Sequence, residues 1–422
     1  MKTYRVAILG CRARGEAAAR AYHAHPRTEL VALCDVVRER MDALGDALGV
    51  SQSARFANLD EMIERARPDI VAIPVGTEFH YPLLKRVLAH GVNVEVEKPI
   101  CTSLDQADEV LALAKQKGAR VAVHHQRRID PPMRAAWRAY QEGKIGRVRY
   151  IQGSDKGYYG GYGLMNIGTH VINNMLKFGV RCHSVSATAL TGGRLVTPED
   201  VVQAAQGMGI VAGDHITATL QFEGNVTGTV LLHRFPKVDN TANGMEIYGT
   251  EGRIIWRVYG AWRLPQPHFV PDGTRDRWEA LPIDYPTGFG PCGAGDAAEA
   301  KGRADVDDYC FVDEYVRALD EDRDHECNGE EGRHVLEILM GILESAAYGR
   351  RVELPQMQRD HPLLRWRREH GLGDPGPAPR PYKEWLEAEE ARIARGAGTR
   401  NGSSAAPPAR TNGALQPAGA AR

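Results

Sequence analysis

The chain has 422 residues, of which 43% are apolar and 25% are charged, and its formal net charge is −1. This length is sufficient for two or more domains with their own cores. The balanced charge provides no global basic field for holding nucleic acid. No stretch approaches the roughly 18 consecutive apolar residues of a transmembrane helix. We therefore expect a globular protein with no nucleic-acid partner and no membrane span.

Seven cysteines are scattered along the chain, and none forms a C-x-x-C pair. This pattern predicts a reduced, cytoplasmic protein without a disulfide framework or a zinc site. The adjacent His124 and His125 would point to opposite faces of a strand, so they do not predict a metal site.

The first third of the chain alternates short apolar runs with helical patterns. The predicted strands are residues 5–9, 29–34, 69–74, 92–96 and 120–124, and the predicted helices are residues 14–23, 37–48, 58–67, 81–90 and 104–117. Apolar strands that alternate with helices form a parallel sheet covered on both faces. We expect an α/β fold whose first domain, residues 1–125, is a doubly wound Rossmann sheet.

The pattern changes after about residue 147, where strands follow one another with turns between them. The predicted strands are residues 148–152, 184–190, 218–222, 227–232 and 245–248, and helices are predicted near 312–319 and 332–348. We expect an α+β domain over residues 126–390 with an open, mostly antiparallel sheet. Residues 261–305 lack periodicity and predict a long loop at a site or a subunit contact. Residues 391–422 are rich in Ala, Gly, Pro and Ser and predict a disordered tail.

A glycine pattern joins the first predicted strand to the first helix. Dinucleotide binding needs a tight turn, a close approach of the backbone to pyrophosphate, and tight packing of helix on strand. Gly10 and Gly15 meet the first and third needs, whereas Arg12 stands where the middle glycine is usual. Its side chain would neutralise phosphate charge or shift the pyrophosphate outward. We expect Gly10, Arg12, Ala13, Arg14 and Gly15 to form the cofactor turn.

Asp35 follows Gly15 by 20 residues, at the end of the second strand. An acid there accepts hydrogen bonds from the adenosine ribose and repels a 2′-phosphate, which favours NAD over NADP. Arg38 and Arg40 lie nearby and weaken that preference. Asp35 is also placed to cap the helix that begins at Val37, and the two roles are compatible.

Glu97-Lys98-Pro99 ends the strand at residues 92–96. Ligands of open α/β sheets bind at the carboxyl ends of the strands, so Lys98 is predicted to face the crevice where a nicotinamide would lie. A Glu-Lys-Pro sequence by itself is more often a surface turn, but its position in a nucleotide-binding domain favours a functional role.

With these features, the chain resembles the glucose–fructose oxidoreductase / inositol dehydrogenase / MocA family over roughly residues 1–360. The resemblance implies oxidation of a secondary alcohol on a carbohydrate or cyclitol, and frequent assembly into homo-oligomers, here a dimer or a tetramer. In that family the lysine of Glu-Lys-Pro lies between nicotinamide and substrate, and we carry this role to Lys98. We place Glu97 and His80, which matches a loop position near the nicotinamide ribose, at the cofactor. The matching segments are the glycine turn with Asp35, and residues 73–80, 94–99, 126–131, 143–146 and 160–173.

Asn166, His170 and Asn173 share one face of a predicted helix. The family usually carries Asp at both asparagine positions, and an amide can position a hydroxyl but cannot take its proton. His170 is therefore expected to act as the base with Lys98, since its reference pKa of about 6.5 lies near neutrality. Without the resemblance, His170 would be interpreted as a helix histidine bonded to a backbone carbonyl.

Other side chains are candidates for holding the substrate. Tyr158, with Tyr159 and Tyr162, is placed to stack on sugar faces, although hydrophobic packing explains the same residues. Arg128, with Arg127, can bond hydroxyls or form surface ion pairs, and the two interpretations are balanced. We expect Asn166, Asn173, Tyr158 and Arg128 to contact the substrate.

Three functions remain open from the sequence. The first is an NAD-dependent oxidoreductase that oxidises a secondary hydroxyl of a sugar, glycoside or cyclitol, with Lys98 and His170 handling the proton. The second is a redox-neutral, NAD-dependent glycosidase or epimerase-like enzyme, suggested by the two asparagines. The third is a non-catalytic NAD-binding protein, suggested by Arg12 and the missing acids.

Overall fold

The computed structural model describes residues 2–266, 278–290 and 304–400. The first domain contains a six-stranded parallel sheet in the order β3-β2-β1-β4-β5-β6. The strand order reverses between β1 and β4, which opens a crevice at the carboxyl ends of these strands. The predicted Rossmann sheet is therefore confirmed. Its strands are β1 (Tyr4–Leu9), β2 (Thr28–Cys34), β3 (Arg55–Phe56), β4 (Ile70–Ile73), β5 (Asn93–Val96) and β6 (Val121–Val123).

Five helices connect these strands, and the local sequence sets several of their ends. The Asn58 side chain caps the third helix by accepting hydrogen bonds from the backbone N–H groups of Asp60 and Glu61. Gly49 and Gly118 end the second and fifth helices with φ of 70° and 67°, which glycine adopts without steric cost. The helices are α1 (Ala13–Ala24), α2 (Arg38–Leu48), α3 (Leu59–Ala66), α4 (His80–Ala89) and α5 (Leu104–Lys117).

The second domain is built on a large sheet in the order β17-β16-β15-β14-β7-β13-β12-β8-β18, with β9 paired to β8. Strands β7 and β13 are parallel, and the other pairs are antiparallel. The expected open, mostly antiparallel sheet is confirmed. Its strands are β7 (Val148–Ser154), β8 (Cys182–Thr191), β9 (Arg194–Leu195), β12 (His215–Phe222), β13 (Val226–His233), β14 (Gly244–Gly249), β15 (Arg253–Arg257), β16 (Gly260–Leu264), β17 (Glu279–Ala280) and β18 (Val352–Glu353). A separate hairpin pairs β10 (Val202–Gln203) with β11 (Ile210–Val211).

Part of the predicted loop at residues 261–305 belongs to this sheet. Strand β16 pairs with β15 and β17 pairs with β16, so the loop prediction is wrong for residues 261–264 and 279–280. Pairing with β15, which ends two residues before β16 begins, supplies the hydrogen bonds that hold β16 extended. Buried and half-buried residues do not alternate along β16, so its sequence gives no period-two signal. The remaining residues of the predicted loop include 267–277 and 291–303, which lie outside the described residues.

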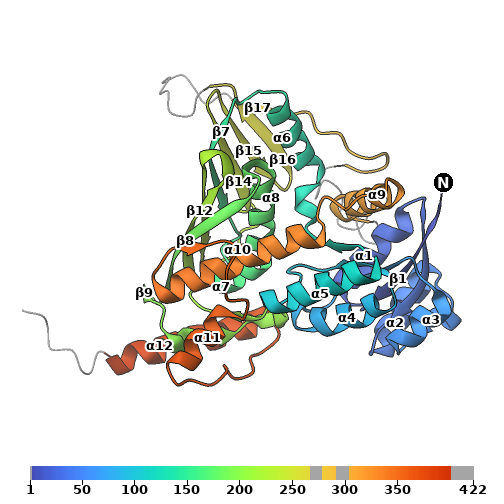
Figure 1. Ribbon diagram of the computed structural model, residues 1–422, viewed down its shortest axis with the longest axis horizontal. Helices are drawn as coiled ribbons and strands as arrows, with labels where there is room; N and C mark the ends of the chain where they lie inside the picture. Colours follow the sequence, from blue (N-terminus) through green and yellow to red (C-terminus); the bar gives the residue numbers. More distant parts are fainter. Residues whose placement is uncertain (1, 267–277, 291–303, 401–422) are drawn as a thin grey trace, which may run out of the picture.

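Helices lie between the sheet and the first domain (Figure 1). The central helix begins as α7 (Gly160–Gly163), passes through a π-helical turn (Leu164–Gly168) and continues as α8 (Thr169–Gly179). The long helix α10 (Gly329–Tyr348) packs against β8, α8 and α5, and therefore joins the two domains. Helix α6 (Pro131–Gln141) packs on β15 and β16, and α9 (Val306–Asp320) packs on α1.

The chain ends with α11 (Pro362–Glu369) and α12 (Tyr382–Arg400). The predicted tail began at residue 391, and that boundary is wrong because α12 continues through Arg400. Alanine and arginine, which suggested low complexity there, are also strong helix formers. Ile393 packs against the core. Residues 401–422 of the predicted tail lie outside the described residues.

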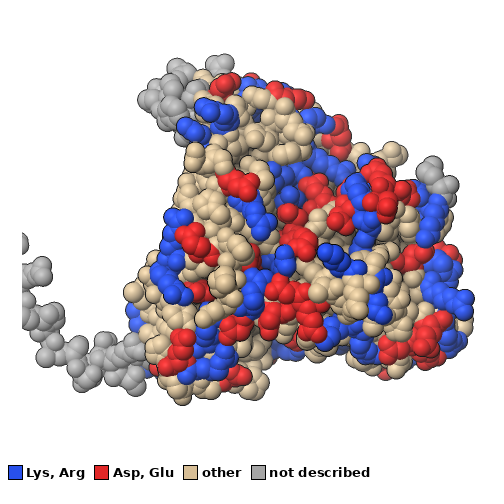
Figure 2. Space-filling model, in the orientation of Figure 1, with Lys and Arg blue, Asp and Glu red and all other residues tan. Residues whose placement is uncertain are grey.

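The described helices include none that is long and apolar enough to cross a bilayer. On the face shown in Figure 2, Lys and Arg side chains are interspersed with Asp and Glu over both domains. That face therefore carries no extended surface of a single charge.

Candidate active site

The turn between β1 and α1 requires glycine at two positions. Gly10 has φ of 110°, and a Cβ atom there would lie 2.7 Å from Cγ1 of Val75. A Cβ on Gly15 would lie 1.9 Å from the carbonyl oxygen of Gly10, so no side chain fits without moving the backbone. The turn therefore combines the tight reversal and the close helix–strand packing that a dinucleotide site needs.

The other three residues of the turn have different environments. Arg12 and Ala13 are exposed. Arg14 is instead held by two carboxylates: its Nε lies 2.6 Å from Oε1 of Glu97, and its Nη1 and Nη2 lie 3.3 and 3.2 Å from the oxygens of Asp308. Arg12 is thus the arginine of this turn that is open to a ligand.

Asp35 holds the turn in place from the end of β2. Its Oδ2 accepts a hydrogen bond from the backbone N–H of Cys11 at 2.6 Å, and its Oδ1 accepts one from Val37 at 2.8 Å. The second contact is the helix-capping role considered from the sequence. A carboxylate has about four acceptor positions, so Asp35 keeps capacity for ribose hydroxyls.

A cavity of about 490 Å³ opens beside this turn and is lined by Gly10, Arg12, Asp35 and Arg40 among others. Arg86 and Arg380 also line it, and they are ion-paired with Asp60 and Glu78, so the lining contains four guanidinium groups. The absence of a side chain at Gly10 and this positive charge fit the pyrophosphate of a dinucleotide. The residues present therefore fit NAD.

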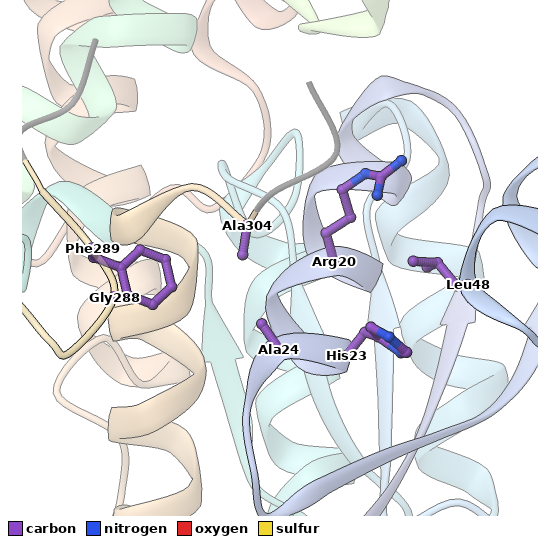
Figure 3. Close-up of a pocket in the computed structure, with 7 residues that line it drawn as sticks. All are labelled: Arg20, His23, Ala24, Leu48, Gly288, Phe289 and Ala304. Carbon is purple, nitrogen blue, oxygen red and sulfur yellow. The ribbon is translucent and has the colours of Figure 1, made fainter. Parts of the chain in front are cut away.

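A second cavity of about 320 Å³ lies beside the C-terminal half of α1, and Arg20, His23, Ala24, Leu48 and Phe289 are among the residues that line it (Figure 3). The glycine turn is at the opposite end of α1. This cavity is therefore separate from the dinucleotide pocket.

Lys98 follows β5 at the crevice. Its Nζ donates hydrogen bonds to the backbone O and to Oδ1 of Asn166, at 2.8 and 2.9 Å. Burial lowers the pKa of Lys98 to about 8, although the negative charge of Glu97 opposes the shift. An ammonium group has three N–H donors, so the third remains for a ligand. The structure thus brings together Lys98 and Asn166.

Glu97 is ionised next to Lys98. Burial opposes its charge, but Arg14, His124 and Lys98 outweigh that effect and lower the pKa of Glu97 to about 2. Its carboxylate is occupied by Arg14. Glu97 therefore supplies fixed negative charge beside Lys98.

His170 is buried, with 8% of its surface exposed, and its ring meets the His125 ring edge-on at 5.5 Å between centroids. Its Nδ1 has no hydrogen-bond partner among the described residues. Burial and the positive charge of Lys98 hold the pKa of His170 well below 6.5. The reference value that we assumed from the sequence therefore does not apply, and His170 is neutral near neutral pH.

The π-helical turn lies where the central helix passes Lys98. Such turns insert one residue into an α-helix and are frequent at functional sites. Asn166 is in this turn, and His170 follows it at the start of α8. The backbone carbonyl of Asn166 accepts a hydrogen bond from Lys98, so the helix backbone itself takes part in the site.

Asn173 and Arg128 contact each other. Nη1 of Arg128 lies 2.6 Å from the backbone O and 3.2 Å from Oδ1 of Asn173, and its Nε lies 3.2 Å from Glu326. Asn173 is only 1% exposed. Both predicted substrate residues are therefore engaged in internal contacts.

The three tyrosines form a cluster with the start of α12. The Tyr158 ring lies 5.3 Å from that of Tyr162 and 5.1 Å from that of Tyr382, whereas Tyr159 is buried. The Tyr162 hydroxyl accepts a hydrogen bond from Nδ2 of Asn166 at 3.2 Å. This contact links the aromatic cluster to Lys98, and Tyr158 is the partly exposed member of the original three.

His80 is fully buried at the start of α4. Its Nδ1 lies 2.8 Å from the carbonyl oxygen of Pro99, and its Nε2 lies 3.2 Å from that of Val75. Burial lowers the pKa of His80. The side chain ties the loop after β4 to the loop that carries Lys98.

A buried network beside the site was not found from the sequence. Burial opposes the charge of His124, but Glu95 and Asp308, at 2.7 and 2.8 Å, raise its pKa to about 10. Asp308 also binds Arg14, which binds Glu97. The sequence held one signal for this network, because the adjacent His124 and His125 were expected to point to opposite faces of a strand. No sequence signal pointed to Asp308, because it lies in α9, 184 residues after His124 in the sequence.

Two family models match the chain. Residues 4–125 match a model described as an oxidoreductase family with an NAD-binding Rossmann fold, and residues 133–255 match the GFO/IDH/MocA C-terminal domain. The chain belongs to the GFO/IDH/MocA family. The first domain is the NAD-binding domain of this family, and the resemblance identified from the sequence is confirmed.

Curated relatives match parts of the chain. The chain is 30% identical to D-apiose dehydrogenase of Paraburkholderia graminis over 146 residues, which are 35% of this chain and 38% of that protein. It is 31% identical to glycosyl hydrolase family 109 protein 3 of Phocaeicola vulgatus over 122 residues, 28% of this chain and 22% of that protein. These matches span less than half of each relative.

Among solved structures, levoglucosan dehydrogenase in complex with NADH and L-sorbose is similar, with a TM-score of 0.69 and 18% identity. The likeness covers 85% of this chain and all of that one. At this identity the comparison shows a shared fold.

Proposed function

We propose that this protein is an NAD-dependent oxidoreductase that oxidises a secondary hydroxyl of a sugar, glycoside or cyclitol. The observation that supports this function best is the setting of Lys98. Its Nζ is held at the carboxyl end of β5 by two hydrogen bonds that it donates to oxygens of Asn166, and its pKa is about 8. A lysine with this pKa exchanges a proton near neutral pH.

Each residue of the crevice has a separate role in this proposal. When bound, NAD supplies the acceptor for the hydride that leaves the carbon. Neutral Lys98 takes the hydroxyl proton through Nζ, and neutral His170 donates a ring N–H to the same oxygen. Asn166 fixes Nζ, and the partly exposed Tyr158 ring offers a surface for the apolar face of a sugar. In this scheme Asn173 and Arg128 support the central helix.

The test mixes the protein with NAD and a panel of sugars, glycosides and cyclitols and follows NADH absorbance. We expect NADH formation with at least one compound, and a loss of about 10²–10⁴ in kcat for Lys98→Met. Lys117→Met, at the exposed end of α5, is the matched control and should behave like the unsubstituted protein. A flat trace across the panel contradicts the proposal. If the protein binds NAD and Lys98→Met leaves every measurable cellular or enzymatic effect intact, the result would instead support a non-catalytic NAD-binding protein.

We propose a redox-neutral, NAD-dependent glycosidase or epimerase-like reaction as the second candidate. Asn166 carries an amide where the family resemblance implies an acid, and one curated relative is named a glycosyl hydrolase. Release of aglycone from an aryl glycoside without net NADH supports this candidate. Stoichiometric NADH excludes it.

We also propose that the protein assembles as a dimer or tetramer through the large sheet. Residues of β13 alternate between buried and half-buried positions, so one face of the sheet packs inward and the other remains open. Sedimentation equilibrium tests this proposal, and a monomer at micromolar concentration contradicts it.

A further inference from the structure

The segment that leads into α12 lies outside both matched family models, which end at residues 125 and 255. Solved neighbours cover 82–85% of this chain, whereas 98–100% of their own chains are covered. This chain therefore carries residues that those proteins lack.

Three hydrogen bonds fix this segment on the second domain. The backbone N–H of Gln206 donates to the carbonyl oxygen of Arg380 at 2.9 Å, and the N–H of Tyr159 donates to the Tyr382 hydroxyl at 3.0 Å. Nε1 of Trp385, a side chain that is 1% exposed, donates to the carbonyl oxygen of Gln203 at 2.8 Å. The segment from Arg380 to Trp385 is thus anchored on the second domain at three points.

From this position the Arg380 side chain reaches the first domain. Its Nη1 lies 2.5 Å from Oε1 of Glu78, and its guanidinium carbon lies 5.8 Å from the centroid of the Phe79 ring. Both residues belong to the loop after β4. Arg380 therefore bridges the two domains at the mouth of the crevice.

Two glycines make room for this ion pair. A Cβ atom on Gly207 would lie 1.2 Å from Oε2 of Glu78, and one on Gly76 would lie 3.3 Å from Nη2 of Arg380. Gly76 belongs to the first domain and Gly207 to the second. Backbone from both domains thus lies close against the Glu78–Arg380 pair.

Arg380 also lines the 490 Å³ cavity that contains Gly10, Arg12 and Asp35. The ion pair with Glu78 engages Nη1, and the described contacts leave the N–H groups of Nη2 and Nε for a ligand. A guanidinium group matches phosphate geometry and binds it through paired N–H donors. We infer that Arg380 binds a phosphate of the dinucleotide, so that the C-terminal segment forms one wall of the NAD pocket.

This inference rests on the NAD-binding part of the proposed function and not on the substrate. The test measures dissociation constants for NAD, ADP and adenosine by calorimetry with the full chain. We expect Arg380→Ala to weaken the binding of NAD and ADP by about tenfold, equivalent to about 1.4 kcal/mol, and to leave the binding of adenosine unchanged. The loss should shrink as salt rises, because the contact is between charges.

Arg368→Ala is the matched control. Arg368 is also in the C-terminal region, pairs with one carboxylate, Asp360, and is 55% exposed, compared with 53% for Arg380. Because Arg380→Ala leaves Glu78 without its cation, the double variant Glu78→Gln/Arg380→Gln removes both charges and keeps a polar side chain at each position. It should show the same loss for NAD and ADP with an unchanged melting temperature.

Unchanged ADP affinity in both Arg380 variants would overturn the inference, as would an equal loss for adenosine. An equal loss in Arg368→Ala would also overturn it. Normal NAD binding without any sugar oxidation contradicts the proposed catalytic function and leaves this inference intact.

Discussion

The hydrogen bond between Lys98 and Asn166 provides a direct test of the proton chemistry. Asn166→Asp places a negative charge where Oδ1 now lies 2.9 Å from Nζ. Two unit charges about 4 Å apart near a protein surface interact by about 4 kcal/mol, and one pKa unit corresponds to about 1.4 kcal/mol. The substitution should therefore raise the pKa of Lys98 by about three units above its present value of about 8.

This shift changes the pH dependence of oxidation in a defined direction. If neutral Lys98 is the base, kcat/KM for oxidation rises with pH through the pKa of Lys98. At pH 7.5 the neutral fraction should fall by up to about 10³-fold in Asn166→Asp, and the midpoint of the profile should move upward. The assay is the pH dependence of initial NADH formation at saturating NAD, with the fastest substrate of the panel.

Asn328→Asp is the matched control. Asn328 caps α10 by accepting a hydrogen bond from the backbone N–H of Glu331, and Asp caps helices equally well. Its profile should match that of the unsubstituted protein. A midpoint for Asn166→Asp at or below the original value would refute the assignment of Lys98 as the base.

Three further predictions concern the cofactor turn and the buried network. Asp35→Ser should improve NADP binding relative to NAD by about tenfold, because it removes the carboxylate that repels a 2′-phosphate beside Arg40; competitive titration tests this, and an unchanged ratio contradicts it. Gly15→Ala should abolish NAD binding and destabilise the fold by about 1–3 kcal/mol, because its Cβ would meet the Gly10 carbonyl. Denaturant unfolding measures the stability and titration measures the NAD affinity, and normal values of both would disprove this prediction. The pKa of His124 is raised to about 10, so its stabilising contribution is complete below its unfolded pKa of about 6.5 and is lost as pH rises through about 10. Between pH 6 and 10 the melting temperature of His124→Gln should fall less than that of the unsubstituted protein. Parallel pH dependences of the two melting temperatures would count against a charged, buried His124.

Most of the first domain was predictable because its signals are local. Short apolar runs, glycine at helix ends and the Asn58 cap define elements within a few residues of chain. The glycine turn and Asp35 are also local, since backbone conformation and strand position determine what they can do. The order of motifs was enough to identify the family and to place Lys98 at the crevice.

Residues 261–280 and the C-terminal helix α12 were harder to predict because tertiary contacts determine their structure. Strand β16 pairs with β15 and β17 pairs with β16, and α12 is anchored by Trp385 on Gln203. Composition alone favoured a loop and a tail. Propensity is a weak guide where tertiary contacts supply the stability.

The sequence by itself determined the Rossmann domain, the cofactor turn and the candidate residues Lys98 and His170. Only the tertiary structure decided their charge states, because burial and neighbouring charges from other elements set each pKa. It made His170 a neutral imidazole, engaged Arg128 and Asn173 in a structural contact, and brought Arg380 to the dinucleotide pocket. These contacts join residues up to hundreds of positions apart, and no local pattern in the chain encodes them.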